Sequence, residues 1–214
     1  MSRIETLSRL QMSWSTISLL RKLMLIILFV ALAFFAKGIY MPAKALLAQQ
    51  LLNFAWARHL EDGELHRPWP WADSEPLAQL QMAGEDPLII LAGATGNNLA
   101  FAPAWMINSS PFNGNGNSVL FGHNDTHFNI LKKVQIDDEI WLTTYADTLL
   151  TYQVIETKIV NENEMSVIQD NGQEQLTLIT CYPFDSNIVQ SDLRFVVVAK
   201  RIKNNSFAHH NSGY

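Results

Sequence analysis

The stretch LTLITCYP, residues 176–183, has the pattern of a β-strand that ends at a proline. In an extended chain successive side chains point to opposite faces, so the odd and even positions of this stretch face different surroundings. Leu176, Leu178 and Thr180 then share one face, and Ile179 and Cys181 share the other. The chain must change direction at Pro183, which places Cys181 near the end of a strand.

Other short apolar runs with the same texture follow residue 87. Turn-forming residues separate them, as in the NGNGN stretch at 113–117 and in Asn171-Gly172. Short strands at such spacing predict a small all-β sandwich or barrel. The runs are Pro87–Leu91, Ser118–Phe121, Glu139–Thr144, Leu149–Thr157, Leu176–Thr180 and Phe195–Ala199.

Length and composition limit the class of protein. A chain of 214 residues with 48% hydrophobic and 16% charged side chains suits one folded domain with an appendage. The single cysteine excludes an internal disulfide framework and a zinc site built from several cysteines. Residues 45–214 carry a net charge of −10, so nucleic acid is not an expected partner.

The N-terminal segment has the composition of a membrane span. Residues 23–36 are fourteen consecutive apolar residues, and the stretch 23–41 is long enough to cross a bilayer. Four basic residues precede it, which by the positive-inside rule places the N-terminus in the cytoplasm and the rest of the chain outside. A cleaved signal peptide is the alternative, but the small-residue patterns at 31–33 and 43–45 fit a cleavage site only loosely.

The segment after this span predicts a juxtamembrane helix and a linker. Residues 44–60 carry Leu47, Leu51, Phe54 and Ala55 at helical spacing, and the PWPW stretch at 68–71 cannot continue a helix. The two tryptophans of that stretch either pack on the domain or lie at the membrane interface. We therefore expect five segments: a cytoplasmic N-terminus at 1–22, a transmembrane anchor at 23–41, a juxtamembrane helix and linker at 42–75, a folded domain at 76–202 and a flexible tail at 203–214.

Three residues at strand ends are candidates for chemistry. Cys181 is either a small buried hydrophobic residue or a nucleophile. An unpaired cysteine outside the cytoplasm is exposed to oxidation unless it is buried or takes part in the chemistry. His123, after the run 118–121, suits acid–base work but is equally explained as a surface histidine. Arg194 opens the last strand, where it forms a salt bridge to Asp192 or Asp185 or stabilises a developing oxyanion. The His123-Asp125-His127 spacing matches no metal motif, so the sequence predicts no metal site.

Together these residues resemble the sortase family. Thr177-Leu178-Ile179-Thr180-Cys181 is a TLxTC signature, Gly122-His123 lies upstream and Arg194 lies downstream. The sequences HNDTHF at 123–128, TCYPFD at 180–185 and PWPW at 68–71 are similar to class GN sortases of Gram-negative bacteria. Similar sequences have Arg where Asn124 stands and Gly-Asp where this chain has Asp137-Asp138.

The resemblance implies an eight-stranded sortase-type β-barrel with short helices and a cysteine transpeptidase activity. In that assignment Cys181 is the nucleophile, His123 the acid and base, Arg194 the cation beside the oxyanion, and Thr180 helps to bind the substrate. The implied partner is a protein with a C-terminal sorting signal, and it is held at the inner membrane. Its acyl fragment would pass from a thioester on Cys181 to an amine acceptor that the sequence does not identify. No cofactor is implied.

Two other functions remain open from the sequence. A thiol peptidase of the same fold would let water replace the amine. A membrane-anchored β-barrel that only binds a partner would bury Cys181 as an inert side chain.

Overall fold

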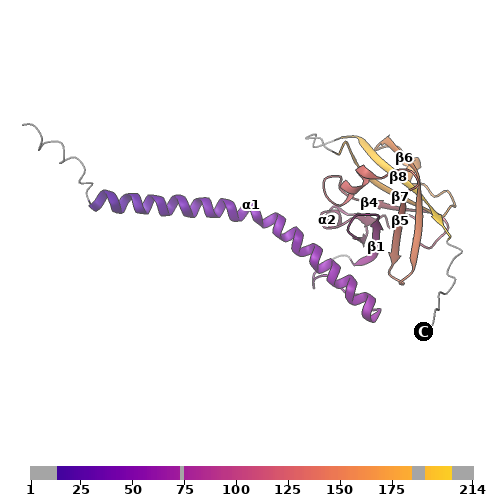
Figure 1. Ribbon diagram of the computed structural model, residues 1–214, viewed down its shortest axis with the longest axis horizontal. Coiled ribbons are helices and arrows are strands. Elements are labelled where there is room, and N and C mark those ends of the chain that lie inside the picture. Colours follow the sequence, from indigo (N-terminus) through magenta and orange to yellow (C-terminus); the bar gives the residue numbers. More distant parts are fainter. Residues whose placement is uncertain (1–13, 73–74, 185–190, 204–214) are drawn as a thin grey trace, which may run out of the picture. The chain divides into compact units, whose positions relative to one another are not determined.

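Eight strands form a closed barrel in the computed structural model, which describes residues 14–72, 75–184 and 191–203 (Figure 1). The strands follow one another around the barrel in the order β1-β2-β3-β4-β7-β8-β6-β5. This confirms the predicted eight-stranded barrel. The strands are β1 Pro76–Met82, β2 Leu88–Ala92, β3 Ala104–Trp105, β4 Asn117–Phe121, β5 Glu139–Thr144, β6 Leu149–Asn161, β7 Gln175–Tyr182 and β8 Leu193–Ile202.

Six of these strands coincide with the apolar runs of the sequence, and two do not. β1 alternates buried and more exposed positions along its length, with Ala78, Leu80 and Met82 buried. Gln79 and Gln81 interrupt the apolar residues, so β1 lacks the continuous apolar run that marks the six predicted strands, although its alternation is typical of a half-buried strand. β3 has only two residues and shows no periodicity. Three short helices lie in the connections: α2 Gly96–Leu99, η1 His127–Lys133 and η2 Met165–Ile168.

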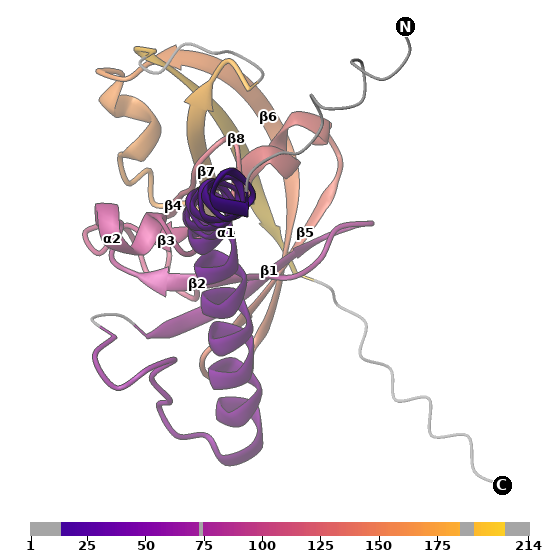
Figure 2. The same cartoon turned by 90° about the vertical axis from the view of Figure 1, so that its left-hand side faces the viewer.

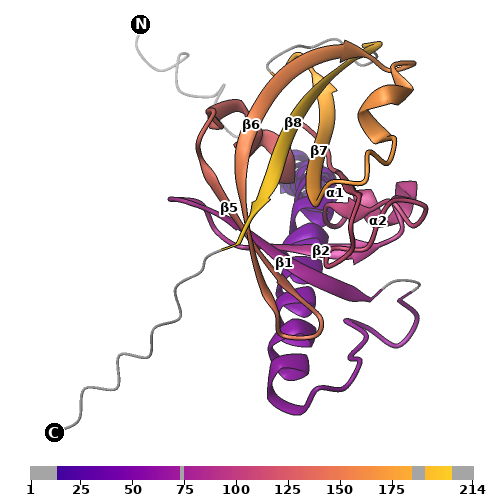
Figure 3. The ribbon, with the colours of Figure 1, turned by 90° about the vertical axis from the view of Figure 1, so that its right-hand side faces the viewer.

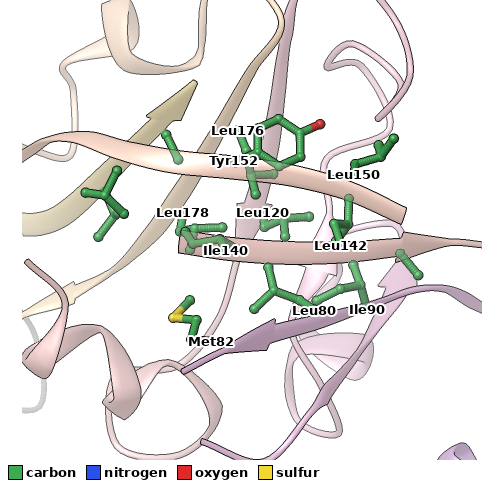
Figure 4. Packing of buried hydrophobic residues seen from close by; sticks show 14 of the residues in the cluster. Leu80, Met82, Ile90, Leu120, Ile140, Leu142, Leu150, Tyr152, Leu176 and Leu178 are labelled. Carbon is green, nitrogen blue, oxygen red and sulfur yellow. The ribbon is translucent and has the colours of Figure 1, made fainter. Parts of the chain in front are cut away.

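Leucine and isoleucine side chains from most strands fill the barrel interior (Figure 4). Leu80, Leu120, Leu142 and Leu178 are completely buried there. Tyr152 brings a polar atom into this core, and its hydroxyl donates a 2.9 Å hydrogen bond to the Phe112 carbonyl. That bond satisfies the polar group, as burial requires. The interior is therefore a packed core, and a functional site must lie on the outside or at an end of the barrel.

One part of the barrel mixes strand directions. β4 runs parallel to β7, and β8 runs antiparallel to β7 on its other side. β6, β8 and β7 lie side by side in Figure 3. Parallel neighbours bring their carboxyl ends to the same edge, and an antiparallel neighbour brings its amino end there. The end of β4, the end of β7 and the start of β8 therefore meet at one edge.

A single helix, α1 Trp14–Asp62, replaces the two separate segments expected on either side of Pro42. The chain divides into two compact units, Met1–Leu47 and Ala48–Tyr214, and α1 contributes to both. Its residues Arg21–Tyr40 are long and apolar enough to cross a membrane, which is consistent with an anchor or a signal sequence. The expected cytoplasmic segment and flexible tail lie largely outside the described residues.

Within the second unit, the end of α1 packs on the outer face of the barrel (Figure 2). Leu52 and Trp56 contact Ile89 and Leu91 of β2 and Ala104 of β3 in one buried cluster. The apolar face expected from the sequence was only partly correct, because Ala55 is buried and Leu51 half-buried, whereas Leu47 and Phe54 are 59% and 60% exposed. The other buried positions of this part of the helix are Ala48, Leu52, Trp56 and His59.

Candidate active site

Cys181 lies near the end of β7 and faces outward from the barrel. Leu178, three residues earlier, belongs to the interior core, whereas Ile179 belongs to a second cluster on the outer face. Because side chains alternate along a strand, Cys181 shares the outer face with Ile179. The thiol is free and half-buried. It is therefore neither a core hydrophobe nor a fully exposed group.

Arg194 lies directly opposite Cys181. The Cα atoms of the two residues are partners in the antiparallel β7–β8 pair, and such opposite side chains lie close enough to interact. Val196, two residues further along β8, belongs to the same outer cluster as Ile179, so Arg194 also faces outward. β7 and β8 thus place a thiol and a guanidinium side by side on one face.

Three contacts hold the Arg194 guanidinium. Its Nη1 donates to the carbonyls of Ser191 and Leu193 at 2.6 and 2.9 Å, and its Nη2 donates to Glu162 Oε2 at 2.5 Å. The ion-pair partner is therefore Glu162 at the end of β6, where the sequence suggested Asp192 or Asp185, and Asp185 lies outside the described residues. A guanidinium has five N–H donors, so these three contacts leave two others for a further acceptor.

His123 is held at the same edge of the barrel by the parallel pairing of β4 with β7. Phe121 and Ile179 are Cα partners, and His123 and Cys181 each follow their partner by two residues. The backbone N–H of Gly122 donates to the Ile179 carbonyl at 3.2 Å. The His123 side chain is exposed. Strand register thus brings the predicted histidine, cysteine and arginine to the same edge of the barrel.

Thr180 connects the two strands at this point. Its side chain is 2% exposed, and its hydroxyl donates a 2.7 Å hydrogen bond to the Gly122 carbonyl. This contact fixes the backbone immediately before His123. The predicted contact of Thr180 with substrate stays a prediction, and the geometry favours a role in positioning His123.

Gly122 is required by a close approach of the following turn. A Cβ atom at this position would lie 2.6 Å from Cγ of Phe128, whose side chain is completely buried. The N–H of Phe128 also donates to the His123 carbonyl at 3.0 Å and closes the turn. The Gly-His pair therefore has a physical basis, because a larger residue at 122 would displace either the core ring or the turn that carries His123.

The structure distinguishes the two neighbouring histidines. His127 is half-buried, and its Nε2 lies 3.0 Å from the amide nitrogen of Gln49 on α1. Burial is the largest of the causes that lower the pKa of His127, followed by the nearby His123. An exposed His123 and an enclosed, neutral His127 agree with the assignment of acid–base chemistry to His123. Within the described residues, no group of three or more His, Cys, Asp or Glu side chains is placed to hold a metal ion.

Sequence reasoning missed Glu162 and Gln49. Glu162 contacts Arg194 although the two are 32 positions apart in the sequence, and Gln49 contacts His127 although they are 78 positions apart. Neither residue stands in a recognisable motif. The sequence therefore carries no signal for either contact, and only the closed barrel with α1 docked on it reveals them.

The family model described as "Sortase domain" matches residues 83–202, more than half of the chain. The chain belongs to the sortase family, whose members are cysteine transpeptidases.

Two curated relatives share this region. Sortase D of Bacillus subtilis is 36% identical over 90 residues, which cover 41% of this chain and 44% of the relative. Sortase A of Listeria monocytogenes is 34% identical over 117 residues, which cover 53% of this chain and 50% of the relative. The chain thus spans about half the length of the curated relatives that it matches.

Solved structures agree on the fold. Sortase A from Corynebacterium diphtheriae is 25% identical with a TM-score of 0.55, and the match covers 64% of this chain and 66% of that chain. The Listeria monocytogenes sortase A structure is 29% identical with a TM-score of 0.53, covering 60% of this chain and 88% of that chain.

Proposed function

We propose that this protein is a membrane-anchored cysteine transpeptidase that cleaves a sorting motif near the C-terminus of a partner protein and transfers the new carboxyl end to an amine. The observation that supports this most is the outward-facing Cys181–Arg194 pair beside the turn of His123. A non-catalytic binding module would have no need to place the thiol half-exposed beside a guanidinium.

The proposed reaction has two halves. The Cys181 thiolate attacks the backbone carbonyl of the sorting motif and forms a tetrahedral intermediate. The His123 imidazolium gives its proton to the departing amine as the C–N bond breaks, which leaves a thioester on Cys181. An acceptor amine then attacks the thioester, His123 takes its proton, and the C–S bond breaks to release Cys181 and a new amide.

Arg194 stabilises the oxyanion of both tetrahedral intermediates in this scheme. Its contacts to Glu162, Ser191 and Leu193 fix the guanidinium plane before substrate arrives, and pre-oriented donors are effective because they need no reorganisation. The two N–H groups left by those contacts supply the donors. Lysine at this position would lack the planar guanidinium with its fixed N–H donors, so Arg194→Lys should be severely impaired.

The proposed location follows from the N-terminal segment. The apolar part of α1 anchors the protein as a single-pass protein of the inner membrane, with the N-terminus in the cytoplasm and the catalytic domain in the periplasm. The flanking motifs at 68–71, 123–128 and 180–185 support placement among the class GN sortases. Holding enzyme and substrate at one surface raises their effective concentration.

Intact mass spectrometry of the full chain in detergent micelles tests the reaction. The protein is incubated with a pool of LPxTG-like peptides, with and without a small amine. We expect a peptide adduct on Cys181 that the amine converts into a new amide, and no adduct with Cys181→Ala. An adduct resolved by water alone, even with excess amine, would favour a hydrolase.

Arg194→Ala tests the oxyanion role in the same assay. Lys200→Ala is the matched control, because Lys200 is an exposed cation on the same strand. We expect the rate of adduct formation to fall by about a hundredfold or more for Arg194→Ala and to stay unchanged for the control. Near-normal turnover of Arg194→Ala would contradict the role.

A further inference from the structure

Gln49 of α1 makes two contacts with one nitrogen atom. Its Nε2 donates to the carbonyl of Phe101 and lies 3.0 Å from Nε2 of His127. A carbonyl oxygen only accepts hydrogen bonds, so the Phe101 contact identifies this atom as the amide nitrogen. Gln49 lies within the same compact unit as His127, at the start of the part of α1 that packs on the barrel.

These contacts determine where His127 carries its proton. An amide nitrogen only donates, so Nε2 of His127 must be the acceptor. The proton of the ring then lies on Nδ1, which is 3.4 Å from the Thr126 hydroxyl. His127 is therefore neutral while the contact to Gln49 persists.

The surroundings of His127 favour the same state. Burial lowers its pKa most, the nearby His123 lowers it further, and Asp125 acts in the opposite direction. Asp125 is exposed to solvent. A protonated His127 would have to share a small region with His123, and like charges disfavour each other's charged form.

His127 also belongs to the turn that positions His123. One end of this turn is fixed by the bond from Thr180 to Gly122, and the other end by the buried Phe128. Gln49 is a third attachment, and it comes from α1 rather than from the barrel.

We propose that Gln49 is a positioning residue for catalysis, which holds His127 as the neutral Nδ1–H tautomer and so fixes the turn of His123 without a second positive charge beside it. This proposal rests on the acid–base role given to His123 in the proposed function. That role requires His123 to be protonated when the substrate amine departs, and a neutral His127 places no like charge beside it. The end of α1 is then part of the catalytic apparatus.

Histidine-selective ¹⁵N NMR of the full chain in detergent micelles tests the proposal without any turnover. Long-range ¹H–¹⁵N correlations report the tautomer and the titration midpoint of each ring, and His127→Asn and His123→Asn assign the signals. We expect His127 to be the Nδ1–H tautomer. Gln49→Glu supplies an acceptor instead of a donor, so the midpoint of His127 should rise by about one pH unit or more.

Gln49→Leu removes the donor without adding charge. We expect the His127 midpoint to rise, and the pH profile of thioester formation on Cys181 to change with it. Gln50→Leu is the matched control, because it changes the adjacent, exposed glutamine of the same helix. The control should leave both midpoints and the pH profile unchanged.

Two results would overturn the proposal. One is a His127 ring with its proton on Nε2 in the unaltered protein. The other is a Gln49→Leu variant with unchanged tautomer and midpoints, or one that loses rate equally at every pH, as a purely structural contact would. If Cys181 never forms an adduct, the proposed function fails, whereas the tautomer of His127 still reports on Gln49 directly.

Discussion

Replacing Thr180 by Val separates a positioning role from a substrate contact. The two side chains have nearly the same shape, so the change removes the hydroxyl and little else. That hydroxyl donates at 2.7 Å to the Gly122 carbonyl from a residue that is 2% exposed. A buried acceptor left without its donor costs about 1–3 kcal/mol. A loss of about 2 kcal/mol would raise the ratio of unfolded to folded protein about thirtyfold.

The same change should affect catalysis through His123, whose backbone begins at the freed carbonyl. Misplacement of a catalytic group by about 1 Å can cost about a hundredfold in rate. We expect kcat for peptide cleavage to fall by between about tenfold and about a hundredfold, with KM nearly unchanged. Urea unfolding gives the change in stability, and steady-state cleavage of a fluorogenic sorting peptide gives the two kinetic constants.

Thr180→Ser is the control, because it keeps the hydroxyl and should retain most of kcat. The reasoning would be refuted if Thr180→Val kept full stability and kcat, or if it raised KM alone. A raised KM alone would instead support the direct substrate contact predicted from the sequence.

Three further changes test other features. Gly122→Ala forces a Cβ against the buried ring of Phe128, so we expect thermal unfolding to show a loss of about 1–3 kcal/mol and peptide cleavage to fall sharply; an unchanged melting temperature would contradict the close approach. A chain of residues 48–214 should be monomeric by gel filtration and unfold cooperatively by circular dichroism. A chain of residues 60–214 should aggregate, because it lacks Leu52 and Trp56, which cover β2 and β3. Equal behaviour of the two chains would show that the helix contributes no stability. Because folding lowers the pKa of His127, the unfolded chain binds this proton more tightly than the folded protein. The stability that His127 contributes is therefore present above its ordinary pKa near 6.5 and is lost as the pH falls through its folded-state pKa. Urea unfolding at several pH values should show a smaller loss of stability in acid for His127→Gln, and an identical pH slope would exclude this coupling.

Short apolar runs separated by turn-forming residues were sufficient to predict six of the eight strands. β5, for example, begins and ends where the run Glu139–Thr144 does. β1 was missed because Gln79 and Gln81 break its apolar residues into single positions, so that only alternation and no continuous run marks it, and β3 was missed because two residues carry no period. The buried face of α1 was only partly predicted, because a helix leaving an apolar span has hydrophobic residues on several faces and only the contact with β2 and β3 selects one of them.

The candidate site was predictable as residue types but not as an arrangement. A histidine, a cysteine and an arginine at strand ends indicated the chemistry, whereas their meeting depends on the parallel pairing of β4 with β7. Contacts between distant positions, such as Arg194 with Glu162, leave no local pattern. The sequence did contain one clue to local geometry. Asp137 has φ of 76°, a conformation suited to glycine, at the position where the sortase resemblance leads us to expect Gly.

The parallel pairing of β4 with β7 has a consequence for folding. The two strands are far apart in the sequence, since Thr180 and Gly122 are 58 residues apart. Such non-local pairings form slowly, because a long loop must close before any contact is gained. Until that closure, Cys181 lacks its histidine, although Arg194 can already lie opposite it through the more local β7–β8 pair. The complete set of cysteine, histidine and arginine is therefore assembled only when the barrel closes, so the proposed activity should appear late in folding.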